Sequence, residues 1–271
     1  MTYTVPWLSV GFMLLAMWMG VVIPLVLYLF VRKRFPCGGS AFWVGCGVMF
    51  LFAFVLEQAV HYLVLNGPMG PTVQENIWLY SLYGGLMAGL FEETGRFVAF
   101  RTVLRKHRDR DQTALMYGAG HGGFEAFWLL TIGMLNNLIF AVLLNTGNEQ
   151  LITANLSGAD LAAVETAFVT LSTTPAWMFL VSILERGAAV VAQLALSVLV
   201  WFAASRREKI WMFPLAIMLH LLLDAVAVIV NGMGAPLMLV ELLVWILAVV
   251  YAVFARRLWR RAAATTEHGH G

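Results

Sequence analysis

The sequence is poor in charge. Only 12% of its 271 residues are Asp, Glu, Lys or Arg, whereas soluble globular domains contain about 25%. Hydrophobic residues, in contrast, make up 61% of the chain. A chain with so few charges lacks the polar groups that cover the surface of a soluble domain, so an ordinary soluble protein is excluded. The composition instead predicts a protein that crosses the lipid bilayer several times.

Cysteine is also scarce, and basic residues form no extended patch. The two cysteines, Cys37 and Cys46, lack the CxxC spacing of a metal site, and we interpret them as structural. The formal net charge is +2, and Lys and Arg occur in short runs between hydrophobic segments. Membrane topology explains such runs, so the sequence indicates no nucleic-acid partner and a lipid bilayer as surroundings.

Long hydrophobic runs are abundant. A membrane-spanning helix needs about 20 mostly apolar residues. Seven runs of sufficient length occur, at 7–31, 41–65, 77–104, 113–145, 175–204, 210–230 and 235–258. We therefore predict an all-α polytopic membrane protein with seven transmembrane helices. The fourth run is too long for one straight span, and we expect it to bend or to continue past the bilayer, with its glycine-rich stretch YGAGHGG as the expected place.

The basic residues predict how the chain is oriented. Lys and Arg follow the first, third, fifth and seventh runs and are absent from the other loops. Because cytoplasmic loops carry the excess of basic residues, the N-terminus is expected outside and the C-terminus in the cytoplasm. We expect residues 1–262 to form a single transmembrane helical domain, followed by a short disordered cytoplasmic tail over 263–271. The predicted location is a bacterial plasma membrane.

Ionisable residues interrupt several of the hydrophobic runs. Such residues are costly near the bilayer centre, so each one is a candidate functional group. They are Glu57 with His61, Glu92 and Glu93 with Arg96, His121 with Glu125, Glu185 with Arg186, and His220 with Asp224. The first pair lies toward the outer half of its run, which favours a structural or gating role for it.

Three of these groups lie at a common predicted depth. Counted from the cytoplasmic ends of their runs, Glu93, His121 and His220 lie about eleven, eight and ten residues into the membrane. Glu125 and Asp224 each follow a histidine by one helical turn, on the same helix face. Three helices are therefore expected to bring pairs of polar groups into one layer.

Two imidazoles and a carboxylate from separate helices suit two kinds of site. One is a zinc site formed by Glu93, His121 and His220 with water in the open fourth position. The other is a metal-free carboxylate–histidine pair that activates water. Both predict hydrolysis. Arg96 can neutralise one of the two adjacent glutamates, which leaves the other available as a ligand or a base.

Structural interpretations remain open for each group. Glu92, Glu93 and Arg96 could form a buried ion-pair network that locks helices together. His121 could pack among glycines. His220 and Asp224 could form a local hydrogen bond that has no catalytic role. Glu125 could position His121 or serve as a ligand itself.

The motifs EETGR, YGAGHGGFEA and HLLLD together resemble the YhfC family of intramembrane metalloproteases, which is related to the CPBP (Abi, CAAX-protease-like) and PrsW membrane proteases. These families carry a Glu-Glu motif followed by Arg or Lys, an aromatic-x-x-x-His motif and a His-x-x-x-Asn or Asp motif on separate helices. The corresponding residues here are Glu92, Glu93 and Arg96; Tyr117 and His121; and His220 and Asp224. The resemblance implies that one Glu and the first His bind or activate the attacking water, with the last pair as further ligands or oxyanion stabilisers.

The sequence departs from the related patterns in two places. One residue fewer separates Glu93 from Arg96 than in the CPBP pattern, which fits YhfC or PrsW better. Gln193 stands where the YhfC pattern tends to have a His, and this difference implies an altered or inactive site if that His matters in the relatives.

We therefore predict an intramembrane peptidase, of the metallopeptidase or glutamate type, with zinc as the expected cofactor. Its substrate would be a membrane-associated peptide or protein. The residues expected to take part in catalysis are Glu92, Glu93, Arg96, His121, Glu125, His220 and Asp224. The alternatives are a proton-coupled membrane transporter and a catalytically inactive membrane scaffold. The odd number of spans and the lack of a detectable internal repeat count against a transporter.

Overall fold

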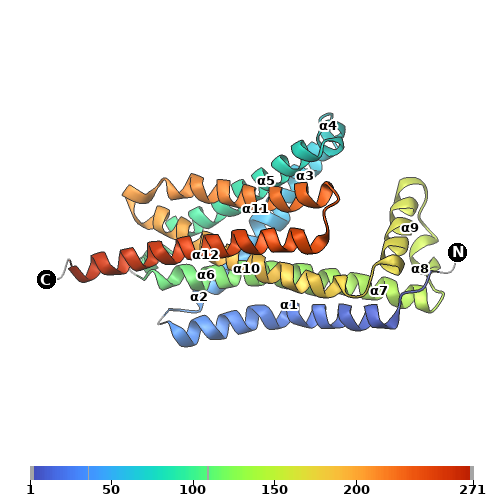
Figure 1. Ribbon diagram of the computed structural model, residues 1–271, viewed down its shortest axis with the longest axis horizontal. Helices are drawn as coiled ribbons and strands as arrows, with labels where there is room; N and C mark the ends of the chain where they lie inside the picture. The colour runs from blue at the N-terminus through green and yellow to red at the C-terminus, as the bar shows by residue number, and fades with distance from the viewer. Residues whose placement is uncertain (1–2, 36, 109, 269–271) are drawn as a thin grey trace. The chain divides into compact units, whose positions relative to one another are not determined.

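The computed structural model describes the backbone of residues 3–35, 37–108 and 110–268 and the side chains as far as residue 262. All regular elements within these residues are helices, which confirms the predicted all-α fold (Figure 1). The α-helices are α1 (Trp7–Arg34), α2 (Ser40–Leu51), α3 (Gln58–Leu65), α4 (Gly70–Glu75), α5 (Ile77–Arg101), α6 (Gln112–Ala126), α7 (Gly133–Asn145), α8 (Gln150–Thr153), α9 (Gly158–Thr173), α10 (Met178–Ser205), α11 (Met212–Gly232) and α12 (Leu237–His268). The π-helical segments are η1 (Phe52–Glu57) and η3 (Phe127–Ile132), and the 3₁₀ segments are η2 (Arg105–His107) and η4 (Arg207–Lys209).

Six helical segments of the described chain are long and apolar enough to cross a membrane. They are Trp7–Arg34, Ser40–Leu65, Gln112–Thr146, Met178–Ser205, Arg207–Gly232 and Leu237–Ala262. They correspond to six of the seven predicted spans, so the polytopic architecture is confirmed. The remaining predicted span, 77–104, corresponds to α5, which has 25 residues but carries the two adjacent glutamates and Arg96. A membrane span over 77–104, and with it the count of seven, stays a prediction, as does the orientation.

The fourth predicted run forms one continuous helical stretch, Gln112–Thr146. Residues 118–123 lie inside α6, which is regular α-helix to its end. The departure from α-helical hydrogen bonding comes later, in η3, and a comparable π-helical segment, η1, interrupts the second run. A bend at the glycines stays a prediction, and the contacts of the glycines show another role for them. They allow neighbouring helices to approach α6.

Glycine permits α2 and α6 to pack at short distance. A Cβ atom at Gly45 would collide with the backbone of Tyr117, and one at Gly120 would collide with the backbone of Phe42. The thiol of Cys46 donates a hydrogen bond to the carbonyl of Gly120 at 3.3 Å. Membrane helices associate through such small-residue contacts because lipid surroundings provide little hydrophobic driving force between helices.

Gly120→Ala is expected to lower the midpoint of thermal unfolding in detergent by roughly 5 °C or more. The new methyl group would overlap the main chain of Phe42, which cannot rotate away. Gly47→Ala on α2 is the matched control, because a Cβ atom there meets no heavy atom within 4 Å. The control should be neutral or slightly stabilising, since Ala favours a helix over Gly by about 1 kcal/mol. Equal midpoints for both variants would contradict the close packing.

The chain packs into two compact units. The first comprises Met1–Ile23 and Ala126–Arg186, and the second comprises Pro24–Glu125 and Gly187–Gly271. Three long helical stretches, α1, the run from α6 to α7, and α10, contribute residues to both units. This division is finer than the single domain over 1–262, which stays a prediction. Helix α12 is described as far as His268, inside the predicted tail, and residues 269–271 lie outside the described residues.

The first unit is tied together by side-chain hydrogen bonds to the backbone of α1 and of the segment before it. The amide of Asn145 accepts from the backbone N–H of Val5 at 2.7 Å and donates to its carbonyl at 2.9 Å. Thr131 donates to the carbonyl of Met17 at 3.0 Å. Glu185 and Arg186, which the sequence also places within a span, form an ion pair with each other in this unit.

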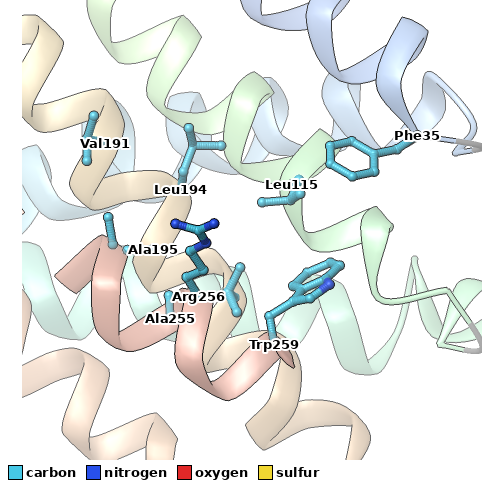
Figure 2. Close-up of a pocket in the computed structure, with 10 residues that line it drawn as sticks. Phe35, Leu115, Val191, Leu194, Ala195, Ala255, Arg256 and Trp259 are labelled. Carbon is cyan, nitrogen blue, oxygen red and sulfur yellow. The ribbon is translucent and has the colours of Figure 1, made fainter. Parts of the chain in front are cut away.

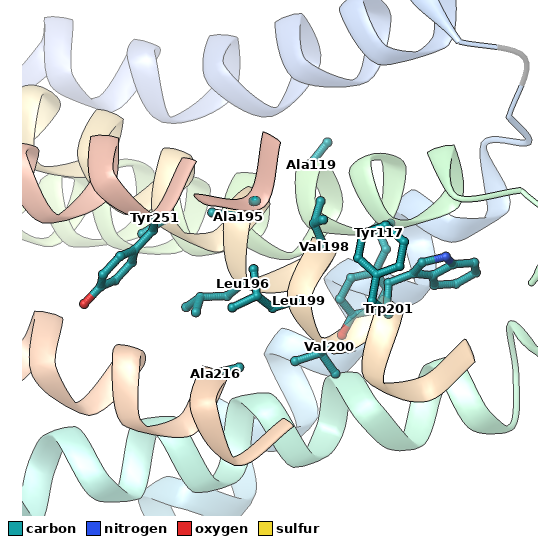
Figure 3. Close-up of a cluster of buried hydrophobic side chains, with 14 of the residues drawn as sticks. Tyr117, Ala119, Ala195, Leu196, Val198, Leu199, Val200, Trp201, Ala216 and Tyr251 are labelled. Atoms are coloured by element: carbon teal, nitrogen blue, oxygen red, sulfur yellow. The ribbon is translucent and has the colours of Figure 1, made fainter. Parts of the chain in front are cut away.

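The core of the second unit is centred on α10. Every residue from Ala195 to Ala204 is buried. Figure 3 shows side chains of this stretch, among them Leu196, Leu199 and Val200, together with Ala216 of α11 in one apolar cluster. Helices α5 and α11 pack along each other in the same unit (Figure 1). These helices, with α6, carry the polar residues predicted to form a site.

Candidate active site

Small residues set the spacing of the helices that carry the polar groups. On α5, a Cβ atom at Gly85 would lie 2.8 Å from the carbonyl oxygen of Leu221, and one at Gly89 would lie 3.5 Å from Cβ of His220. On α6, a Cβ atom at Gly122 would lie 2.9 Å from Cβ of Gln193. Larger residues at these positions would push α11 and α10 away, so the glycines bring the polar side chains within contact distance.

Glu93 is completely buried and bound through both carboxylate oxygens. Nη1 of Arg96 donates to Oε1 at 2.8 Å and to Oε2 at 2.7 Å. Nδ1 of His220 lies 2.8 Å from Oε1 of the same carboxylate. Arg96 is buried as completely as Glu93. The guanidinium charge therefore compensates this member of the glutamate pair.

Glu92 is buried but has different partners. Its Oε2 lies 2.9 Å from Nε2 of His121 and accepts a hydrogen bond from Nε2 of Gln193 at 2.9 Å. Its other oxygen, Oε1, lies 3.9 Å from Nε2 of His220, which is beyond hydrogen-bond distance. The two adjacent glutamates therefore occupy different environments: one faces a guanidinium and the other faces two imidazoles.

His220 connects these environments. Its Nδ1 contacts Glu93, while its Nε2 lies 3.6 Å from Oδ2 of Asp224 and 3.9 Å from the carboxylate of Glu92. A carboxylate on one ring nitrogen fixes the orientation of a histidine and leaves the other nitrogen to face a ligand. In His220 the nitrogen available in this way is Nε2.

His121 presents the same nitrogen, Nε2, to the carboxylate of Glu92. On its other side, Nδ1 lies 3.4 Å from the hydroxyl group of Tyr117, whose ring stacks on the imidazole. Both rings are completely buried. The aromatic residue of the predicted aromatic-x-x-x-His motif thus supports the histidine one turn away.

Gln193 of α10 joins the network at its centre. Its Nε2 donates to Glu92 and to Glu125, each at 2.9 Å, and its Oε1 accepts from Arg96. Through this residue the seven predicted site residues form one connected network. In the sequence, Gln193 stands out only as a departure from the family pattern. Its depth, about twelve residues from Ser205, places this polar residue in the same layer and was the available signal.

A polar cavity of about 400 Å³ adjoins the network at Asp224. Glu57 and His61 line it, with Nε2 of the histidine 3.1 Å from Oε1 of the glutamate, and Tyr83 lies 2.9 Å from the other ring nitrogen. The side chain of Asp224 is 37% exposed, whereas Glu93 and His121 are inaccessible. A cavity lined by ionisable groups at this depth is expected to hold water. Asp224 is the network residue that lines this cavity.

The donor set of the network suits zinc, although the described residues contain no group of three His, Cys, Asp or Glu side chains already arranged around a metal position. Two imidazole nitrogens face one carboxylate, and a second carboxylate lies 3.6 Å from Nε2 of His220. Ligand atoms of a tetrahedral zinc ion are about 3.3–3.5 Å apart, given bonds of about 2.0–2.2 Å. The chemical identities of these side chains are therefore those of a zinc ligand set, and the distance between His220 and Asp224 is close to this spacing.

Comparisons with known proteins give two matches. A family model described as YhfC intramembrane metalloprotease matches residues 19–256. The chain is also similar to a protein of Bacillus subtilis (strain 168) described as "Uncharacterized membrane protein YhfC", with 29% identity over 259 residues that cover 93% of this chain and 98% of the relative. No solved structure matches the chain. Neither match supports the transporter or the scaffold alternative.

Proposed function

Since the chain belongs to the YhfC intramembrane metalloprotease family, we propose that it is a membrane-embedded peptidase in which Glu92 activates the attacking water. Membership confirms the resemblance that the three motifs carry, while the relation to the CPBP and PrsW proteases stays a prediction. The proposed substrate is a peptide segment of a membrane-associated protein. The proposed location is a bacterial plasma membrane.

The difference between the two glutamates carries this proposal. Arg96 holds both oxygens of Glu93, so that carboxylate is already compensated. Glu92 has one oxygen beyond hydrogen-bond distance of the nearest imidazole nitrogen, and a carboxylate in this state can accept a proton from water. We therefore assign the role of base to Glu92 and the role of charge compensation and positioning to the other member of the pair.

The family description implies a metal cofactor. We assign its binding to His121, His220 and Asp224, because two imidazoles and a carboxylate form a common catalytic zinc set. This set differs from the one expected from the sequence, which contained Glu93, because the contact between Glu93 and Nδ1 of His220 suits a carboxylate that orients a ligand. When bound, zinc supplies a Lewis acid that polarises the scissile carbonyl and makes water more acidic.

The protein groups then have defined tasks. Glu92 takes a proton from water as the water oxygen attacks the carbonyl carbon, and returns it to the amine nitrogen as the peptide C–N bond breaks. Gln193 donates to Glu92 and keeps its carboxylate directed toward His121. The cavity beside Asp224 admits water, while the apolar walls of the helices exclude it elsewhere.

Metal content tests the proposed ligands. Protein purified in detergent is expected to contain about one zinc ion per chain, measured by mass spectrometry of the metal. His121→Ala, His220→Ala and Asp224→Ala should each lose it, because removing one of three protein ligands weakens binding strongly. Glu92→Gln should retain it, because the base is not a ligand in this proposal.

His61→Ala is the matched control for the histidine variants. It also removes an imidazole that contacts a buried carboxylate, but outside the proposed ligand set. All variants must elute as folded protein of the same size. The control should keep the metal. Wild-type protein without stoichiometric metal, or equal metal content in all the histidine variants, would contradict the assignment.

A further inference from the structure

A second cavity lies in the same unit, away from the catalytic network. It has a volume of about 300 Å³, and α6, α10 and α12 line it together with Phe35, which follows α1. None of its lining residues belongs to the proposed active site or to the polar cavity beside it. All of the lining residues except Arg256 are apolar or aromatic.

Arg256 gives this cavity its chemical character. Figure 2 shows its guanidinium reaching from α12 toward Leu194 and Leu115. No hydrogen bond or ion pair of Arg256 occurs within the part of the chain that the structure describes. A guanidinium has five N–H donors, and apolar walls can satisfy none of them. Arg256 is exposed, so an anionic group that approaches the cavity from the surface can reach these donors.

The mouth of the cavity has the features of a membrane interface. Trp259 lines it and packs against Phe202 with ring centroids 6.3 Å apart, and tryptophan is enriched where headgroups meet acyl chains. The guanidinium carbon of Arg34 lies 5.8 Å from the ring centroid of Phe35, so a second cation stands beside a lining residue. Two basic residues from separate helices, Arg34 of α1 and Arg256 of α12, therefore lie near the apolar cavity.

We propose that this cavity is a binding site for an anionic phospholipid. Arg256 binds the phosphate, for which its planar donors are well suited, and one acyl chain occupies the apolar space. A phospholipid fits better than a soluble anion because Arg256 is the only charged lining residue and the surrounding bilayer supplies acyl chains at high concentration. Basic pockets between spanning helices are a known way to hold anionic headgroups. The proposal does not depend on peptidase activity.

Lipid retention tests the proposal. Delipidated protein in detergent is titrated with phosphatidylglycerol or with phosphatidylcholine of the same acyl chains, and bound lipid is counted by native mass spectrometry. One phosphatidylglycerol per chain should bind about tenfold more tightly than phosphatidylcholine. Arg256→Gln should weaken phosphatidylglycerol binding about tenfold. The control Arg257→Gln changes a neighbour that is exposed like Arg256 but does not line the cavity, and it should bind like the wild type.

Two further experiments test the contributions of the acyl chain and of the phosphate group separately. Ala252→Phe narrows the cavity while keeping the guanidinium, and it should also weaken phosphatidylglycerol binding. Inorganic phosphate at millimolar concentration should not displace the lipid, and oleate should compete poorly. Displacement by phosphate alone, or tighter binding of oleate, would overturn the phospholipid assignment.

Equal phosphatidylglycerol binding by Arg256→Gln and Arg257→Gln would also overturn it. Each variant is accepted only if its thermal midpoint in detergent matches that of the wild type. If Arg256→Gln fails this check, Arg256→Lys takes its place. This variant keeps the charge but not the planar fork of donors, and it should bind with intermediate affinity.

Discussion

Glu92→Gln is expected to abolish peptide hydrolysis while the protein keeps its fold and its metal. The amide has the size of the carboxylate and can still accept from Gln193, but it cannot take a proton from water. Loss of a general base typically costs a factor of about 10²–10⁴ in rate. The measurement is the appearance of new peptide termini, by mass spectrometry, when the reconstituted protein is incubated with single-span membrane proteins in liposomes.

Two comparisons make this result specific. Glu185→Gln is the same substitution in the first unit, at a residue paired with Arg186, and should cleave at the wild-type rate. Glu93→Gln should reduce the cleavage rate only to the extent that it also lowers the stability of the protein. Full activity in Glu92→Gln would refute the proposed base. Loss of metal together with activity would instead make Glu92 a ligand.

Arg96→Gln is expected to lower the free energy of unfolding by about 3–5 kcal/mol, because it leaves the buried charge of Glu93 without compensation. Both partners are completely buried, and their contacts are 2.7 and 2.8 Å long. The same change removes the donor to Gln193. Reversible unfolding in mixed micelles of increasing denaturing detergent gives the free energies.

The double variant Glu93→Gln with Arg96→Gln provides the internal control. Removing both charges leaves two neutral amides that can hydrogen-bond to each other, so a large part of the lost stability should return. A double variant that is as unstable as the sum of the single ones would show that the charges act independently. In that case the ion pair between Glu93 and Arg96 would contribute no coupling energy to stability.

Counting residues along helices was sufficient to bring the polar groups together. An α-helix rises about 1.5 Å per residue, so residues at equal distances from the same membrane surface lie at equal depth. His121 and His220 were placed in one layer with the glutamate pair on this basis, and the contacts of 2.8 and 2.9 Å agree with it. The all-α architecture followed from composition and run length in a similar way.

The partner of each glutamate could not be predicted from the sequence. Adjacent side chains on a helix point about 100° apart, so the rotation of α5 about its axis decides which glutamate meets His121 on α6. Arg96 lies on α5 as well, and its rotamer decides which glutamate it binds. The rotation of α5 depends on how it packs against α11 through Gly85 and Gly89. It is a property of the packed helices and leaves no mark on the spacing of residues along one of them.

The sequence by itself determined that this protein is helical and that it lies in a membrane, because hydrophobicity and helical periodicity are local properties of the chain. It also predicted which three motifs carry the chemistry. Only the tertiary structure decided that Arg96 compensates Glu93, that Gln193 joins the network, and that the glycines of α6 serve close packing. The physical reason is that Gln193, which also accepts from Arg96, and the glycines act through contacts between helices far apart in the sequence. A neutral glutamine or a glycine shows its role only when the facing helix is in place.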